Sequence, residues 1–136
     1  MFGAGFGGGL LLGRSLAPSD AGNVNKSIPE PGPIVSIGEF TSNLAGGGRH
    51  VISFTLSLEL INKEGSVALV QTPGWMVRIR NEVFLLAKDR VYDDLTSAEG
   101  TLQFAADIKR SLNAMLPDLS GEPPIERVLF ESIVLQ

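Results

Sequence analysis

The clearest hydrophobic pattern in the chain is a strict alternation in the segment 50–62. The apolar residues of its alternating face are Ile52, Phe54, Leu56, Leu58 and Leu60, with polar or charged residues between them. A period of two predicts a strand with one buried face and one face that meets solvent or a partner. Apolar residues from Ile34 onward predict a shorter strand before it. The glycine-rich turn AGGGRH between the two predicts an antiparallel hairpin.

The spacing of apolar residues changes to a helical one between residues 67 and 95. Pro73-Gly74 interrupts this segment, which predicts a short helix, a break and then a longer helix. The apolar stripe of the longer helix is Ile79, Val83, Phe84, Leu86 and Ala87. We expect the residues between them, including Arg80, to lie in solvent.

A further helix is predicted from Thr96 to Pro117. Thr96 and Glu99 have the spacing of a capping box, in which each side chain bonds to the backbone amide of the other residue. The repeating positions behind it are Leu102, Ala105, Ile108, Lys109, Leu112, Met115 and Leu116. This is the most regular helical pattern in the chain, and proline ends it.

The segment 125–136 predicts a closing strand with imperfect alternation. Val128 and Phe130 would lie on one face, with Leu129, Ile133 and Leu135 on the other. Such a pattern is typical of an interior strand that is covered on both sides for part of its length. The order strand, strand, helix, helix, strand predicts an α+β fold. Its small, mostly antiparallel sheet would carry amphipathic helices on one face.

The chain before residue 34 has a different composition. Its first thirteen residues carry no charge and include six glycines, and residues 15–33 are rich in Ser, Asn, Gly and Pro. A helix of thirteen residues spans only ~20 Å, less than the ~30 Å hydrocarbon core of a bilayer. The segment also lacks the basic start of a signal peptide. Residues 15–33 have the composition of a flexible linker.

The overall composition excludes several classes of function. Of the 136 residues, 43% are apolar and 19% are charged, which fits one folded domain. The formal net charge is −4, so we predict no nucleic-acid partner. The chain has no cysteine, which excludes disulfides, thiolate metal sites and cysteine nucleophiles.

The residues with potential chemistry do not form a recognisable catalytic or metal-binding set. His50 is the single histidine, and we interpret it as a surface residue at a strand end. Asp93 and Asp94 are adjacent, so on a helix they point about 100° apart, and we interpret them as capping and solubilising residues. No serine has the context of a nucleophile, and the glycine runs are poor phosphate loops. We predict no catalytic, cofactor-binding or metal-binding residue.

Trp75 is open to two interpretations. Tryptophan is a favoured anchor at protein interfaces, so Trp75 could face a partner. Packing against the core or a loop is the interpretation that we favour.

Four stretches together resemble the family of flagellar basal body-associated proteins called FliL. They are EFTSNLAGGGRHVISFTLSLEL, RIRNEVFLLAKDRVYDDLTSAEG, IKRSLNAMLP and VLFESIVLQ, and they cover about residues 34–136. The positions that match the family's motifs are Phe40, Asn43, Leu44, Leu58, Glu59, Ile79, Arg80, Tyr92, Asp94, Leu95, Gly100, Leu112, Asn113 and Leu116. The chain departs from the family at Asn81, where aspartate is usual, and at the break formed by Pro73, Gly74 and Trp75.

The resemblance implies a single-pass protein of the bacterial inner membrane at the flagellar basal body, without catalytic activity. Its periplasmic domain, residues 34–136, would be similar to the stomatin-type scaffold domain and would form rings. Residues 1–14 would be a partial or truncated transmembrane segment. The implied partners are further copies of the chain, the stator proteins MotA and MotB and other basal-body components. Acidic residues such as Glu59 and Asp93 could contact basic partner segments, as Trp75 could contact an apolar one.

Two alternatives remain open at the level of the sequence. One is a stomatin-like membrane scaffold that has no connection with flagella. The other is an α+β domain that binds or hydrolyses a small molecule.

Overall fold

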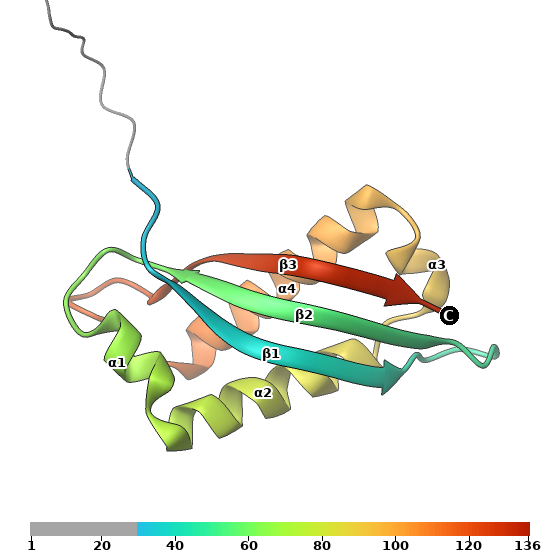
Figure 1. Cartoon of the computed structure of the whole chain (residues 1–136), viewed down its shortest axis with the longest axis horizontal. Coiled ribbons are helices and arrows are strands. Elements are labelled where there is room, and N and C mark those ends of the chain that lie inside the picture. Colours follow the sequence, from blue (N-terminus) through green and yellow to red (C-terminus); the bar gives the residue numbers. More distant parts are fainter. Residues whose placement is uncertain (1–29) are drawn as a thin grey trace, which may run out of the picture. The chain divides into compact units, whose positions relative to one another are not determined.

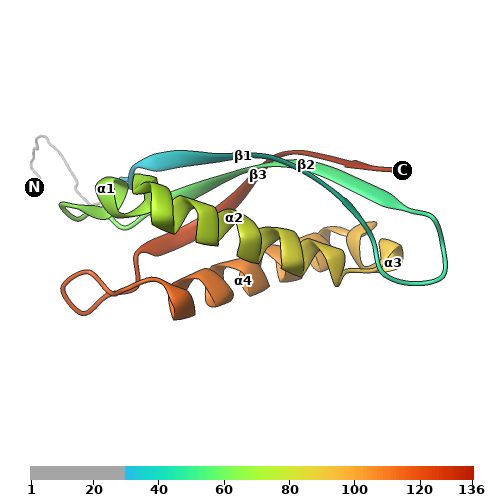
Figure 2. The same cartoon turned by 90° about the horizontal axis from the view of Figure 1, so that it is seen from below.

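The central strand is the one with the strictest alternation, and the rest of the fold is built around it. The computed structural model describes residues 30–136, in which a three-stranded antiparallel sheet carries its helices on one face (Figures 1 and 2). The strands are β1 (Ile34–Asn43), β2 (Val51–Leu60) and β3 (Ile125–Leu135), in the order β1-β2-β3. The helices are α1 (Ser66–Gln71), α2 (Pro73–Lys88), α3 (Tyr92–Leu95) and α4 (Ala98–Met115). The predicted α+β fold is confirmed.

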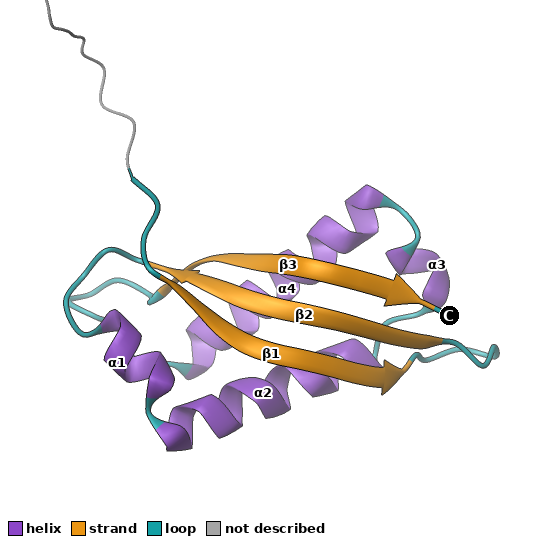
Figure 3. Cartoon of the chain, viewed as in Figure 1, coloured by secondary structure: helices purple, strands orange, loops and turns teal. Residues whose placement is uncertain are grey.

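Figure 3 shows the long helices α2 and α4 behind the sheet. They cover the face of the sheet on which the alternation of β2 places its apolar residues. Ile52, Leu56, Leu58 and Leu60 are completely buried on this face, and Phe54 is almost so. The opposite face of β2 carries Ser, Thr and Glu and has no helix over it (Figure 2). Hydrophobic burial on one face therefore determines the register of the whole sheet.

Two bulges explain the imperfect alternation of β3. The register shifts at Glu126 and again at Glu131, where two residues of β3 lie opposite one residue of β2. After each bulge, the residues of β3 that face the core are displaced by one position along the sequence. The residues that share the inner face are therefore Ile125, Val128, Phe130, Ile133 and Leu135.

The prediction that β3 is an interior strand is therefore wrong. β3 lies at the edge of the sheet, and β2 is the central strand. Ile133 and Leu135 lie opposite Phe54 and Ile52, on the same face as Phe130, whereas Leu129 lies opposite Ser57 on the outer face. The assignment of Ile133 and Leu135 to the face of Leu129 failed because an irregular alternation can come from a bulge as well as from burial on both faces, and the sequence alone does not distinguish the two.

The helical segment 66–88 has the predicted break. Pro73 is the first residue of α2, where a missing backbone N–H costs nothing. Ile79, Val83 and Ala87 are completely buried, as their spacing predicts. Phe84 was expected in the same stripe, but its side chain is 37% exposed, with the Lys88 Nζ 5.4 Å from its ring centroid. On the helix, Phe84 lies about 100° from the centre of the buried stripe.

In α4 the buried stripe begins at Phe104 and not at Leu102. Phe104, Ile108 and Leu112 are completely buried, whereas Leu102 is 70% exposed. The predicted capping box is also wrong: Ser97 is the N-cap, and its Oγ accepts a hydrogen bond from the Gly100 amide at 3.0 Å. Thr96 instead donates its hydroxyl to the Asp93 carbonyl. The helix therefore begins one residue later than the threonine suggested.

Four phenylalanines connect the sheet to α4. The Phe54 ring stacks on Phe40 at 5.1 Å and meets Phe104 and Phe130 edge to face at 5.8 and 5.6 Å. Phe104 stacks on Phe130 at 5.5 Å. Ring pairs at these separations contribute about 0.5–1.5 kcal/mol each beyond the area that they bury. The four rings form the centre of the core.

Arg80 fastens α2 to the edge strand β1. Its guanidinium donates hydrogen bonds to the carbonyls of Ile37 and Glu39 and lies 4.3 Å from the Phe40 ring centroid. β1 has a bulge at this point, followed by Gly38 with a φ of 106°. The expectation that Arg80 is simply solvated is therefore wrong, because its charge is used to satisfy the carbonyls of an irregular strand.

Asn113 fastens α4 to the start of β3. Its amide donates to the Ile125 carbonyl at 3.0 Å and accepts from the Ile125 N–H at 2.9 Å. Ile125 is buried, so these two backbone groups have no access to bulk water. The Asn113 side chain thus makes the two backbone hydrogen bonds that a neighbouring strand would make with Ile125 at the edge of the sheet.

Replacing Asn113 with alanine is expected to lower the free energy of unfolding by about 1–3 kcal/mol, because it leaves both backbone groups of Ile125 without a partner. Denaturant unfolding followed by circular dichroism measures this loss. Asn81→Ala, at an exposed position of α2, should change the stability by less than about 0.5 kcal/mol. Equal effects of the two substitutions would contradict the role assigned to Asn113.

The predicted transmembrane segment 1–14 and most of the predicted linker 15–33 lie outside the described residues. Within residues 30–136, no helix has both the length and the apolar character needed to cross a bilayer. Residues 32 and 33 contact β2: the Leu60 N–H donates to the Pro33 carbonyl at 2.8 Å, and the Gly32 N–H points to a Glu59 carboxylate oxygen at 3.4 Å.

Candidate functional site

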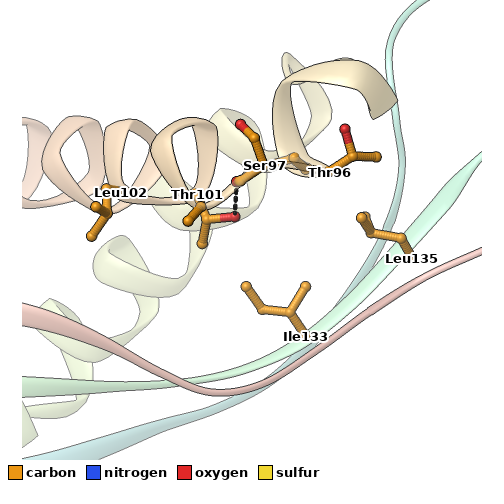
Figure 4. A pocket seen from close by; sticks show the side chains of 8 residues that line it. Thr96, Ser97, Thr101, Leu102, Ile133 and Leu135 are labelled. Carbon is orange, nitrogen blue, oxygen red and sulfur yellow. Dashed lines mark hydrogen bonds between the residues drawn. The ribbon is translucent and has the colours of Figure 1, made fainter.

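An open groove of about 640 Å³ lies between the end of β3 and the beginning of α4 (Figure 4). The residues that line it are Leu95, Thr96, Ser97, Ala98, Thr101, Leu102, Ile133 and Leu135. We call it the β3–α4 groove. In Figure 4 the side chains of Ile133 and Leu135 point from the strand towards the helix and form an apolar floor. The rim of the groove on the helix side carries three hydroxyl groups.

The connection between α3 and α4 creates the groove. α3 is a single turn that buries Leu95, and only two residues separate it from the start of α4 at Ala98. A Cβ at Gly100 would lie far inside contact distance of the Asp94 carbonyl oxygen. Only glycine at position 100 lets the first turn of α4 approach the backbone of α3 so closely. The first turn of α4 stands away from Ile133 and Leu135, which are half-buried.

The three hydroxyls are already used by the local structure. Thr96 donates to the Asp93 carbonyl, Thr101 donates to the Ser97 carbonyl, and Ser97 accepts from Gly100. An activated nucleophile needs a general base within hydrogen-bond reach, and none of the lining residues is a histidine or a carboxylate. The chemistry of the β3–α4 groove is therefore that of an apolar binding surface with a polar rim.

A smaller hollow, of about 230 Å³, lies beside the hairpin turn. His50 stacks on Tyr92 here with ring centroids 4.0 Å apart, and its Nδ1 is 3.0 Å from the Gln136 carbonyl oxygen. The imidazole thus joins the β2 start, the α3 start and the chain end. Within residues 30–136, no three or more side chains of metal-binding type come together.

A third hollow, of about 260 Å³, lies at the start of α2 beside Trp75. The indole is half-buried and packs against the core, with the Arg78 guanidinium 5.3 Å from its ring centroid. The favoured interpretation of Trp75, packing against the core, agrees with this position, and contact of its accessible part with a partner stays a prediction.

The positions that match the family's motifs fall into three structural groups. The buried core holds Phe40, Leu44, Leu58, Ile79, Leu95, Leu112 and Leu116. Arg80, Tyr92, Gly100, Asn113 and Glu59 make the specific contacts described above, with Glu59 also accepting from Arg127 Nε at 3.3 Å. Asn43 and Asp94 have exposed side chains.

The three residues expected to contact partners do not form one site. Glu59 lies on β2, Trp75 on α2 and Asp93 on α3. The structure instead brings together Ile133 and Leu135 with the start of α4, a combination that no local pattern indicates. Phe104 could have been found, because it precedes Ile108 and Leu112 at intervals of four residues.

Asp107 is the centre of an ionic cluster that the sequence pattern does not reveal. Its carboxylate accepts hydrogen bonds from Arg90, Arg110 and Gln103. The Arg90 guanidinium, whose carbon lies 5.1 Å from the Phe104 ring centroid, is the main cause of a lowered pKa of Asp107. Burial raises that pKa and is the second-largest influence, and the hydrogen bonds from Gln103 and Arg110 lower it further.

This lowered pKa predicts an acid-sensitive part of the stability. The unfolded chain binds a proton at Asp107 more readily than the folded chain does, so the contribution is present above about pH 4 and is lost as the pH falls through the folded-state pKa. The free energy of unfolding, measured from pH 7 to pH 2, should therefore fall less steeply in Asp107→Asn than in the parent chain. Asp118→Asn, at an exposed site outside the described ion pairs, should keep the parent slope. Identical slopes for the parent chain and Asp107→Asn would contradict this assignment.

Comparison with known proteins agrees with the resemblance found in the sequence. No curated protein matches the chain. Residues 34–136, which are β1 to the end of β3, match the family model described as flagellar basal body-associated protein FliL. This match covers every helix and strand described above. The chain therefore belongs to the FliL family of flagellar basal body-associated proteins.

Proposed function

We propose that this chain is a non-catalytic protein of the flagellar motor that assembles at the inner membrane and supports the stator. The observation that carries the proposal is the family match over residues 34–136, which include every helix and strand that the structure describes. In this proposal the folded domain is periplasmic and stomatin-like, residues 1–14 belong to a membrane anchor and residues 15–33 form a linker. Copies form a ring that contacts MotA and MotB and supports torque during swimming or swarming.

The two edges of the sheet differ in a way that supports side-by-side assembly. The β1 edge is partly closed, because Arg80 occupies the carbonyls of Ile37 and Glu39. The β3 edge has no such side-chain cap between Glu126 and Leu135 among the described residues, and the β3–α4 groove opens beside it. A contact between this edge and a different surface of the next copy is heterologous, and such contacts close into rings when the rotation allows.

Photo-crosslinking in membranes tests the assembly. A photoreactive phenylalanine analogue replaces Val134, which is 48% exposed on β3, in the full-length chain. We expect a ladder of crosslinked copies, and no ladder from the same analogue at the exposed Asp118. Crosslinks confined to single chains at native density would refute assembly through the β3 edge.

A deletion strain tests the cellular role. Loss of the gene should reduce swimming speed under viscous load and the number of stator foci at the flagellar bases. A plasmid-borne copy should restore both, and a fluorescent fusion should colocalise with basal bodies. Unchanged motility and a fusion spread evenly around the cell would refute the proposal.

A further inference from the structure

The outward side of α2 has an unusual composition for a solvent-facing helix. We define the α2 outer face as Val77, Arg78, Asn81, Phe84, Leu85 and Lys88, all of which are exposed. Val77 is 68% exposed, Leu85 52% and Phe84 37%. The exposed positions of α4, by comparison, include Leu102 as their only large apolar side chain. A helix face with three large apolar residues is typical of an interaction site.

The charge of the α2 outer face is uniformly positive. Arg78 and Lys88 lie over the rings of Trp75 and Phe84, and none of the described salt bridges involves either cation. The single acidic residue of α2, Glu82, accepts a hydrogen bond from Ser111 of α4 and so faces inward. This positive face belongs to a chain whose formal net charge is −4.

We propose that the α2 outer face binds an amphipathic helix of a partner protein, in which apolar residues are bordered by Asp or Glu. The face extends from Val77 to Lys88, a length of ~16 Å or three helical turns. An apolar stripe between two cations matches a helix whose own apolar stripe lies between carboxylates. Phe84 and Leu85 supply the central apolar contacts, while Arg78 and Lys88 select the charge of the partner.

The same features disfavour two other occupants. Two α2 outer faces packed against each other would bring Arg78 next to Lys88 in the antiparallel arrangement and next to Arg78 in the parallel one. Like charges in direct opposition are destabilising. An anionic membrane would attract the two cations but would repel the rest of an acidic chain.

Two designed peptides of 18 residues test the proposal with the full chain. Both have leucines at helical spacing and a fluorescent label; one has glutamates at the borders of the stripe, and the other has lysines. The anisotropy of the peptide label measures binding, and the emission of Trp75, the one tryptophan in the chain, reports whether binding occurs beside α2. We expect the glutamate peptide to bind about tenfold or more tightly than the lysine peptide at low salt.

Variants locate the binding on the α2 outer face. The double substitution Phe84→Ser and Leu85→Ser should weaken binding of the glutamate peptide about tenfold or more, because exposed anchors at the centre of an interface dominate affinity. The double substitution Arg78→Glu and Lys88→Glu should reverse the preference to the lysine peptide. Leu102→Ser, at an even more exposed apolar site on α4, is the control and should leave binding to the α2 outer face unchanged.

The outcomes that overturn the proposal are specific. Equal binding of the two peptides, binding of neither, or equal loss with Leu102→Ser excludes this partner chemistry. Cosedimentation with phosphatidylglycerol vesicles that is lost in the Phe84 and Leu85 variant assigns the face to a membrane instead. A dimer that dissociates in that variant, seen by analytical ultracentrifugation, assigns it to a second copy. The proposal does not depend on the flagellar role of the chain.

Discussion

Replacing Phe104 with alanine should lower the free energy of unfolding by about 3–5 kcal/mol, which is the usual cost of deleting a buried phenyl ring. Phe104 is completely buried, packs on Phe54 and Phe130 and lies beneath the Arg90 guanidinium. Its loss removes ring contacts that join α4 to two strands and leaves a cavity at the centre of the core. Urea denaturation followed by far-UV circular dichroism measures the change in the denaturation midpoint.

Phe84→Ala is the matched control for this experiment. The helical pattern of the sequence assigns Phe84 to the buried stripe of α2, whereas its side chain is 37% exposed in the structure. We expect a loss of less than about 1 kcal/mol, because little apolar surface is removed from a buried site. A larger loss for Phe84→Ala than for Phe104→Ala would show that the packing of the helices on the sheet is described wrongly.

Replacing Gly100 with alanine should cost about 3 kcal/mol or more, although alanine is the better helix former. The added methyl group would meet the backbone carbonyl of Asp94, which is not the end of a flexible side chain and cannot turn aside. Overpacking usually costs 1–3 kcal/mol, and a clash with backbone lies at the upper end of that range or beyond it. Thermal unfolding of the variant measures the effect, and hydrogen exchange at residues 92–101 should increase.

Gly74→Ala provides the matched control. Gly74 is also in a helix, but a Cβ there meets no atom within 4 Å. The substitution should be neutral or should stabilise the chain by up to about 1 kcal/mol, because it reduces the entropy of the unfolded state. If both substitutions stabilise the protein, the close approach of α3 to α4 is not present in solution.

The parts of the fold that could be predicted are those with a local cause. The alternation of β2, the break at Pro73 and the end of α4 at Met115, shortly before Pro117, each depend on residues that are neighbours in the sequence. The edge position of β3 and its bulges depend on which strands pair and in which register, and the partner strand is distant in the sequence. Arg80 illustrates the difference. Its position on the helix predicts a solvent-exposed side chain, yet its guanidinium donates hydrogen bonds to two carbonyls of β1, a strand that is distant in the sequence.

The candidate sites were less predictable than the fold. The β3–α4 groove combines residues 95–102 with Ile133 and Leu135, which are more than thirty positions apart in the chain. The α2 outer face escapes sequence analysis for a different reason: Phe84 fits the predicted buried stripe of the helix, although its side chain is exposed. Exposure distinguishes a core stripe from an interaction stripe, and exposure is a property of the folded chain.

The bulge at Glu131 also bears on how the length of this chain can vary. Glu131 is the additional residue between Phe130, opposite Leu56, and Ser132, opposite Thr55. A chain without Glu131 would still place Ile133 opposite Phe54 and Leu135 opposite Ile52, because only the unpaired residue would be missing. Loss of the neighbouring Ser132 would be accommodated in the same way, since Glu131 would then take its place opposite Thr55. A deletion at this bulge would therefore leave the inward-facing residues of β3 in place, while loss of the Glu131 carboxylate would leave the buried Ser57 hydroxyl without its acceptor.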